Sequence, residues 1–99
     1  MTNTLFIIKI TYTAPIEQID AHLIDHRAYL DQCYAEGHYL TSGPQVPRTG
    51  GIIISQGASR AEIDALMAQD PFSIHGLIEY DVIEFEAVKS IDAIKSWLK

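Results

Sequence analysis

The chain has few of the residues that mark disulfide-rich, disordered or membrane-spanning proteins. Cys33 is its single cysteine, so no internal disulfide can form, which is typical of proteins in the reducing cytoplasm. Four prolines and six glycines in 99 residues are too few for a disordered, collagen-like or linker-type chain. No apolar run exceeds four residues, so we expect neither a signal peptide nor a membrane-spanning helix.

Basic residues are scarce as well. Seven lysines and arginines face thirteen aspartates and glutamates, which gives a formal net charge of -6. The phosphate backbone of nucleic acids and anionic membrane surfaces both repel an acidic protein, so we expect neither as a partner. The remaining composition, with 47% hydrophobic and 20% charged residues, is typical of a soluble globular protein. We therefore expect one domain over residues 1–99, in the cytoplasm.

Hydrophobic patterning predicts an alternation of strands and helices. We expect strands over residues 5–12, 38–42, 52–55 and 77–85, and helices from Pro15 to the glycine cap at Gly37, from the capping box at Ser59 to Pro71, and from Ser90 onward. The order β-α-β-β-α-β with a short C-terminal helix is the ferredoxin-like pattern, an α+β fold with a four-stranded antiparallel sheet.

In the last strand the alternation changes phase. Tyr80 and Val82 lie on one face, but the next apolar residues, Ile83 and Phe85, fall on odd positions. An extra residue in one strand shifts the phase of its side chains in this way. We therefore expect a β-bulge near Val82.

One face of the predicted sheet has no cover. Two helices can pack on only one face of a four-stranded sheet. The other face presents Leu5, Ile7 and one side of the run Ile52–Ile54. Apolar surface left in water costs roughly 25 cal/mol per Å². We therefore expect a homodimer in which two copies pack sheet to sheet.

His26 interrupts an apolar stripe on the first helix, where Leu23 and Leu30 recur at helical spacing. In one interpretation it is a core histidine that bonds a backbone carbonyl or a water. In the other it is a general acid or base, because histidine titrates near neutral pH. The pattern leaves both interpretations open.

Asp70 is a second unusual position, because Pro71 ends the second helix and leaves the carboxylate at the unfavourable end of the helix dipole. Asp70 can cap a turn with Pro71 and Phe72. Alternatively, a cation such as protonated His26 offsets the dipole, and a histidine oriented by a carboxylate is the usual arrangement in an acid–base catalyst. Whether the two side chains meet depends on how the helices pack.

Other polar residues carry weaker signals. His22 and His26 lie four residues apart, but no third ligand has a recognised spacing, so we expect neither a metal nor an organic cofactor. Cys33 lies on the buried stripe and is interpreted as a small hydrophobic residue. Arg48, in the loop between the middle strands, can pair with an anionic substrate or remain solvated.

Two motifs resemble those of the YCII-related proteins. The string EGHYLTSGP, from Glu36 to Pro44 and preceded by His26, is similar to the family signature, as is Asp70-Pro71-Phe72 followed by Gly76. The resemblance covers residues 5–88. It implies a ferredoxin-like domain that dimerises into an α+β barrel, similar in architecture to muconolactone isomerase. It also implies that His26 and Asp70 form an active-site pair.

The family resemblance favours an enzyme, since a few relatives are dehydrochlorinases of chlorinated hydroxyquinol-type aromatics. We expect elimination or isomerisation of a small cyclic or aromatic metabolite, with His26 and Asp70 as catalytic residues. Many members carry an arginine where this chain has Leu23, so anion binding is not implied at that position. A non-catalytic module that binds or senses a small ligand is the alternative. The expected substrate-binding residues are Phe6, Tyr12, Tyr39, Ser42, Gly43, Pro44 and Phe72.

Overall fold

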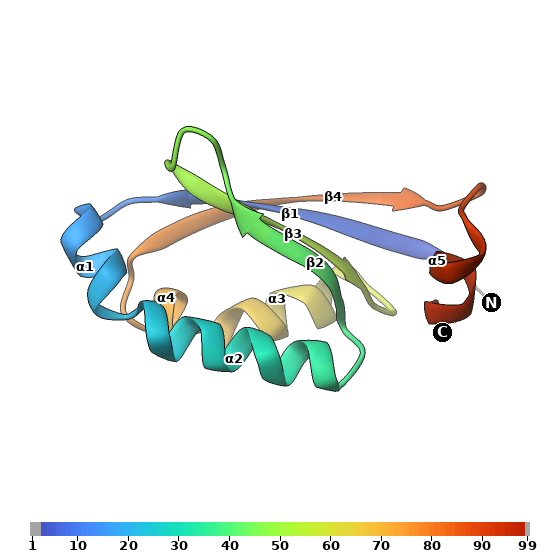
Figure 1. Cartoon of the computed structure of the whole chain (residues 1–99), viewed down its shortest axis with the longest axis horizontal. Coiled ribbons are helices and arrows are strands. Elements are labelled where there is room, and N and C mark those ends of the chain that lie inside the picture. The colour runs from blue at the N-terminus through green and yellow to red at the C-terminus, as the bar shows by residue number, and fades with distance from the viewer. Residues whose placement is uncertain (1–2, 99) are drawn as a thin grey trace.

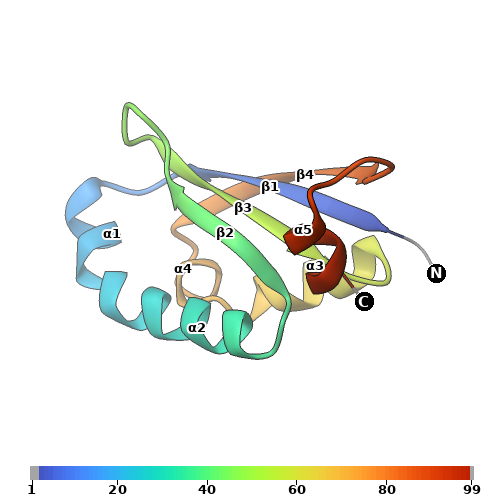
Figure 2. The same cartoon turned by 45° about the vertical axis from the view of Figure 1, so that its right-hand side comes forward.

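The protein consists of a sheet and a layer of helices. The computed structural model describes residues 3–98. In chain order its elements are β1 (Thr4–Tyr12), α1 (Ile16–Ala21), α2 (Leu23–Ala35), β2 (Tyr39–Pro44), β3 (Gly50–Gln56), α3 (Arg60–Ala68), α4 (Pro71–Ile74), β4 (Ile78–Glu86) and α5 (Asp92–Trp97). Helices α1 to α4 all lie on one face of the sheet, and the short α5 lies at its end (Figure 1). Figure 2 shows the same single helical layer from a second direction.

The sheet has the topology that the element order predicts. Its four strands run in the order β2-β3-β1-β4, and every neighbouring pair is antiparallel. β1 is central and pairs with β3 on one side and β4 on the other. The ferredoxin-like α+β fold is therefore confirmed.

The predicted bulge near Val82 is wrong. β4 pairs with β1 without interruption from Thr4↔Glu86 to Tyr12↔Ile78, and the irregularity lies instead in β2, between Tyr39 and Thr41. Ile83 and Phe85 keep their place in the alternation and lie on the face without helices, because Val82 and Tyr80 on the other parity pack against the main core. The apolar residues on odd positions thus belong to the open face.

The main core lies between the sheet and helices α2 and α3. Its buried side chains come from every strand except β4 and from both helices, and they are Phe6, Ile8, Ile10, Cys33, Tyr39, Ile53, Ile63 and Met67. Burial of one such aliphatic or aromatic side chain stabilises the fold by roughly 1.5–3 kcal/mol. Packing in this core fixes the position of α2 relative to β2 and β3.

The first helical segment is two helices and not the single one predicted. α1 ends and α2 begins at His22, whose backbone has φ -109° and ψ 8°. The bend lets Ile19, which is fully buried, pack with Phe72 and Leu77 in a second apolar cluster. A straight helix cannot serve both clusters, so the chain turns at His22.

The second helical segment also divides. Ser59 caps α3 as predicted, since its hydroxyl accepts the Glu62 N–H at 3.3 Å, while the Glu62 carboxylate accepts the Ala58 N–H at 2.9 Å. α3 ends at Ala68, and a separate short helix, α4, follows from Pro71. Asp70 therefore lies at the start of α4 and not at the end of a longer helix.

Two glycines are needed by the backbone. Gly37 has φ 80° and closes α2, where the N–H of His38 reaches back to the Cys33 carbonyl at 2.9 Å, as the predicted glycine cap requires. Gly50 begins β3 against β1, and a Cβ atom there would lie 1.7 Å from the Ile10 carbonyl oxygen. Only glycine allows this approach of the two strands.

Candidate active site

The candidate active site is built around His26 on the inner face of α2. Its Nδ1 lies 2.9 Å from Oδ1 of Asp70, 44 residues along the chain. His26 is 9% exposed and Asp70 is fully buried. Because an ionised carboxylate only accepts hydrogen bonds, Nδ1 is the donor in this contact, and the tautomer that the contact favours for a neutral ring has its free lone pair on Nε2.

Asp70 is held by the backbone of α4. Pro71 disfavours a helical conformation for the residue before it, and Asp70 is extended at φ -67° and ψ 130°. The same proline suits the first position of a new helix. Asp70 Oδ1 caps α4 by accepting the Phe72 N–H at 2.9 Å. Asp70 thus caps the turn with Pro71 and Phe72, and the same carboxylate oxygen also contacts His26. The unfavourable helix dipole expected at Asp70 is absent, because the residue lies at the start of α4.

The imidazole ring of His26 has an aromatic neighbour. Phe72 stacks on it with ring centroids 3.9 Å apart and planes 9° apart, and Tyr12 meets Phe72 edge to face at 6.2 Å. The second carboxylate oxygen of Asp70, Oδ2, is buried and has no hydrogen-bond partner among the described residues. Stacking and a single short bond therefore set the orientation of the ring.

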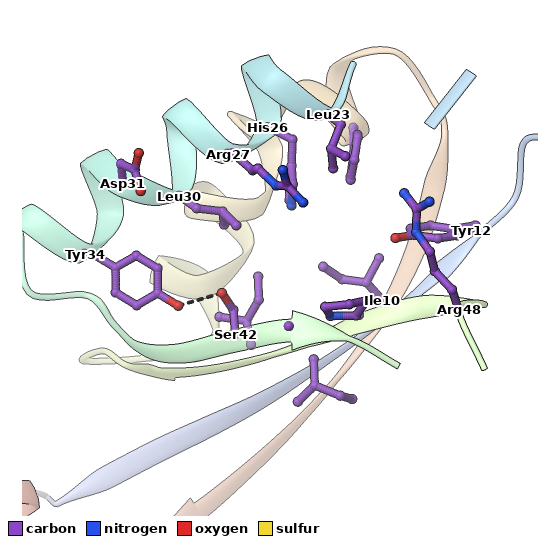
Figure 3. Close-up of a pocket in the computed structure, with 16 residues that line it drawn as sticks. Ile10, Tyr12, Leu23, His26, Arg27, Leu30, Asp31, Tyr34, Ser42 and Arg48 are labelled. Atoms are coloured by element: carbon purple, nitrogen blue, oxygen red, sulfur yellow. Dashed lines mark hydrogen bonds between the residues drawn. The ribbon is translucent and has the colours of Figure 1, made fainter. Parts of the chain in front are cut away.

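A pocket of about 680 Å³ opens beside His26, between α2 and the strands β2 and β3. The predicted site residues among its lining are Tyr12, His26, Ser42, Gly43, Pro44 and Phe72. Figure 3 shows Leu23, His26, Arg27 and Leu30 extending from α2 toward the strands. The hydroxyls of Tyr34 and Ser42 share a hydrogen bond of 2.5 Å across one end of the pocket.

Phe6 and Tyr39 do not line this pocket, contrary to what we expected. Phe6 is fully buried and Tyr39 is 1% exposed, and both belong to the main core between the sheet and the helices. Asp70 also stays off the pocket surface, because it lies behind His26. The hydrophobic pattern of a strand does not distinguish an aromatic residue that faces the core from one that faces a cavity.

Sequence reasoning missed most of the α2 side of the pocket. The lining residues from this helix share a spacing of three, one, three, one and three, and they are Leu23, His26, Arg27, Leu30, Asp31 and Tyr34. This spacing is one face of a helix. The predicted apolar stripe includes Leu23, His26 and Leu30, but it gives no sign that the adjacent positions Arg27, Asp31 and Tyr34 also face the pocket.

Arg48 reaches the pocket from the loop between β2 and β3. Its Nη2 donates to Oδ1 of Asp20 at 2.7 Å, and its guanidinium lies 5.8 Å from the centre of the Tyr12 ring. The hydrogen bond to Asp20 raises the pKa of Arg48. Arg48 therefore already has an ion-pair partner, Asp20.

Three ionisable side chains lie together in the adjoining core. Burial is the main cause that raises the pKa of the Tyr29, Cys33 and Tyr39 side chains. The Tyr29 hydroxyl also donates to the Leu66 carbonyl at 2.6 Å. A buried thiol with a raised pKa is protonated at neutral pH, as expected of a small hydrophobic residue and unlike a nucleophile.

The described residues hold no ready-made metal site. Within residues 3–98 no group of three or more histidine, cysteine, aspartate or glutamate side chains could hold an ion. His22, the possible second ligand, stacks instead on His75 with ring centroids 4.0 Å apart. No helix in the described part of the chain is long and apolar enough to cross a membrane.

Comparisons with known proteins place the fold and the family. A search of curated proteins finds no match. Among solved structures, the chain is similar to 5-chloro-2-hydroxyhydroquinone dehydrochlorinase from Burkholderia phenoliruptrix, in complex with 2,5-dihydroxybenzoquinone. The TM-score is 0.69 at 24% sequence identity, over 80% of this chain and 90% of that one. The YCII-related domain matches residues 4–86, from the first residue of β1 to the last of β4. The chain therefore belongs to the YCII-related family.

Proposed function

We propose that this protein is a cofactor-independent acid–base enzyme that acts by elimination or isomerisation on a small cyclic or aromatic metabolite. One observation carries the proposal: His26, hydrogen-bonded to the fully buried Asp70, lies on the wall of a pocket large enough for a single ring. A histidine oriented through Nδ1 by a buried carboxylate is suited to moving a proton at Nε2.

The two residues have separate roles in this proposal. Asp70 is a positioning residue, because it keeps the proton on Nδ1 and stabilises the imidazolium that forms when Nε2 takes up a proton. His26 is the catalytic residue. The stacked ring of Phe72 keeps the imidazole from rotating away from the pocket.

The proposed elimination balances without a further reactant. Nε2 of His26 removes a proton from carbon or oxygen of the ring, and the released electron pair forms a double bond. The bond to a leaving group such as chloride breaks with its own electron pair. In an isomerisation, the imidazolium instead returns the proton to another ring atom.

The pocket and the comparisons both support a ring-shaped ligand. Leu23, Leu30 and Ile53 supply apolar surface, and Tyr12 and Phe72 supply aromatic surface. The similar dehydrochlorinase, named for a chlorinated hydroxyhydroquinone, was solved with 2,5-dihydroxybenzoquinone bound. These compounds are the natural first probes.

The test measures binding and turnover separately. The protein is incubated with 5-chloro-2-hydroxyhydroquinone under nitrogen and free chloride is measured, while calorimetry follows binding of 2,5-dihydroxybenzoquinone. We expect His26→Asn to lower kcat by roughly 10²–10⁴-fold with little change in binding. His38→Asn, at the far end of α2, is the matched control and should keep full activity.

Each outcome is informative. Binding without turnover in the wild type, measured as chloride release from chlorinated rings and as isomerisation of lactone rings, favours the small-ligand binding module. Full turnover in His26→Asn refutes the catalytic role of the pair. Absence of both binding and turnover across the panel refutes the ring-ligand proposal itself.

We also propose that a second copy of the chain covers the open face of the sheet. Ile7 lies between Ile54 and Ile83 in the register, and Leu5 lies opposite Phe85. Ile83 is 60% exposed and Phe85 is 40% exposed. Four adjoining apolar side chains beside the buried Leu5 form a patch that monomeric proteins seldom leave in water.

A further inference from the structure

Arg27 is a cation of the pocket wall with no ion-pair partner among residues 3–98. The other two arginines are both paired, Arg48 with Asp20 at 2.7 Å and Arg60 with Asp64 at 3.1 Å. In a chain with net charge -6, carboxylates outnumber cations almost two to one. A guanidinium that remains unpaired in such a chain, and faces a cavity, is available to a ligand.

The position of Arg27 relates it to the proposed chemistry. It follows His26 directly on α2, and Figure 3 shows both side chains directed from the helix toward the strands. A ligand in contact with Nε2 of His26 therefore lies within reach of the Arg27 side chain. Guanidinium donates up to five hydrogen bonds in a planar fork, a geometry that matches two oxygens of an anion.

We propose that Arg27 binds an anionic oxygen of the ligand, and that the pocket therefore selects ring compounds bearing a carboxylate or an acidic, deprotonated hydroxyl. The contribution of Arg27 to the reaction rests on the proposed function, whereas its binding of an anion does not. Removal of a proton by His26 leaves negative charge on the ring and its oxygen substituents. An adjacent guanidinium stabilises that charge where it develops.

Asp31 limits where the anion can bind. It lies four residues after Arg27 on the same pocket wall, yet the two side chains form no ion pair. Its carboxylate repels an anion at that end of the pocket, so the anion is directed toward Arg27 and His26. Asp31→Asn should raise the affinity for an anionic probe about twofold or more at low salt.

The test compares charged and uncharged probes of the same shape. Benzoate and benzamide report the carboxylate case, and 4-nitrophenol reports the phenolate case, because only its deprotonated form absorbs strongly in the visible range. Binding is followed by NMR titration of the intact protein up to about 10 mM probe, which reaches weak affinities. Arg27→Gln removes the charge, Arg27→Lys keeps it, and Arg60→Gln is the matched control on the surface.

We expect the wild type and Arg60→Gln to bind benzoate about tenfold or more tightly than benzamide. The preference should disappear in Arg27→Gln and persist in part in Arg27→Lys. A bound carboxylate and a bound phenolate are distinguished by which probe shows the effect. Equal affinities for benzoate and benzamide, a preference unchanged in Arg27→Gln, or no binding of benzoate and 4-nitrophenolate at 10 mM would each overturn the inference.

The same variants separate this inference from the proposed catalysis. His26→Asn should abolish turnover yet keep the benzoate preference. If no ring compound is turned over but the preference depends on Arg27, the enzyme proposal fails and the anion site stands. If turnover depends on His26 while Arg27→Gln leaves the preference for benzoate unchanged, the anion site at Arg27 fails and the enzyme proposal stands.

Discussion

The contact between His26 and Asp70 can be measured as a coupling free energy. The perturbation is a double-mutant cycle of His26→Ala, Asp70→Ala and the pair, with unfolding by urea as the readout. The hydrogen bond that Asp70 makes to the Phe72 N–H is lost in both Asp70 variants and so cancels from the cycle. What remains is the interaction of the imidazole with the carboxylate.

The structure sets the expected magnitude. Asp70→Ala removes a helix cap, which costs about 0.5–2 kcal/mol, and a hydrogen bond to a charged group, which costs about 1.5–3 kcal/mol. Loss of both gives about 2–5 kcal/mol of destabilisation. The bond to His26 is 2.9 Å long and shielded from solvent, since Asp70 is fully buried and His26 is 9% exposed. We therefore expect a coupling free energy of about 1.5–3 kcal/mol for the pair.

The assay needs one matched control and one fixed condition. Arg60 and Asp64 form an exposed pair four residues apart on α3, with a contact of 3.1 Å, and serve as the reference for a solvated ion pair. Exposed pairs of this spacing couple by about 0.3–0.5 kcal/mol. Protein concentration is held constant in every titration, because association of two copies would add to the apparent stability.

A coupling free energy for His26 and Asp70 no larger than that of the exposed pair would refute the reasoning. It would mean that the short buried contact contributes no more than a solvated one. The positioning role assigned to Asp70 would then lose its energetic basis.

Three further predictions follow from other parts of the molecule. Gly50→Ala should lower the free energy of unfolding in urea by about 3 kcal/mol, because its Cβ would lie 1.7 Å from a backbone oxygen. Gly43→Ala is the control, since no atom lies within 4 Å of its Cβ position, and it should change the free energy of unfolding by less than about 0.5 kcal/mol. Wild-type protein should sediment at about twice the 11.0 kDa chain mass, and Ile83→Glu on the open face should sediment as a monomer. The control Ile24→Glu, on the exposed side of α2, should remain a dimer. A monomeric wild type at micromolar concentration would contradict the dimer. Burial raises the pKa of the Cys33 thiol, so the folded state holds this proton to higher pH than the unfolded chain does. The free energy of unfolding should therefore fall as pH rises above about 8.5, and it should fall less in Cys33→Ala. Equal pH profiles for the two proteins would contradict the raised pKa of Cys33.

The order of strands and helices is a property of the sequence alone. Alternation over residues 5–12 and the capping box at Ser59 depend on local side-chain chemistry, so both predicted their elements to within a few residues. Local patterns cannot show which face of a strand meets the core. Ile83 and Phe85 were therefore interpreted as a bulge, although the pairing of β4 with β1 puts them on the open face.

Helix boundaries were decided by packing as much as by sequence. The pattern from Pro15 onward continues through His22 with no helix breaker, yet the chain bends there because Ile19 packs in a different cluster from Cys33. Pro71 was correctly identified as a boundary. Asp70 as the cap and Pro71 as the first residue of a new helix are local signals as well, so the start of α4 is also written in the sequence.

The sequence by itself singled out His26 and Asp70, because each is a polar residue at a position where apolar residues or a neutral cap are expected. Only the tertiary structure decided that they meet, since 44 residues separate them and their contact depends on how α2 and α4 pack on one sheet face. It likewise decided that Arg27 lines the pocket while Phe6 and Tyr39 fill the core. Periodicity reports which residues share a face of an element, but whether a neighbouring element covers that face depends on contacts distant in the chain.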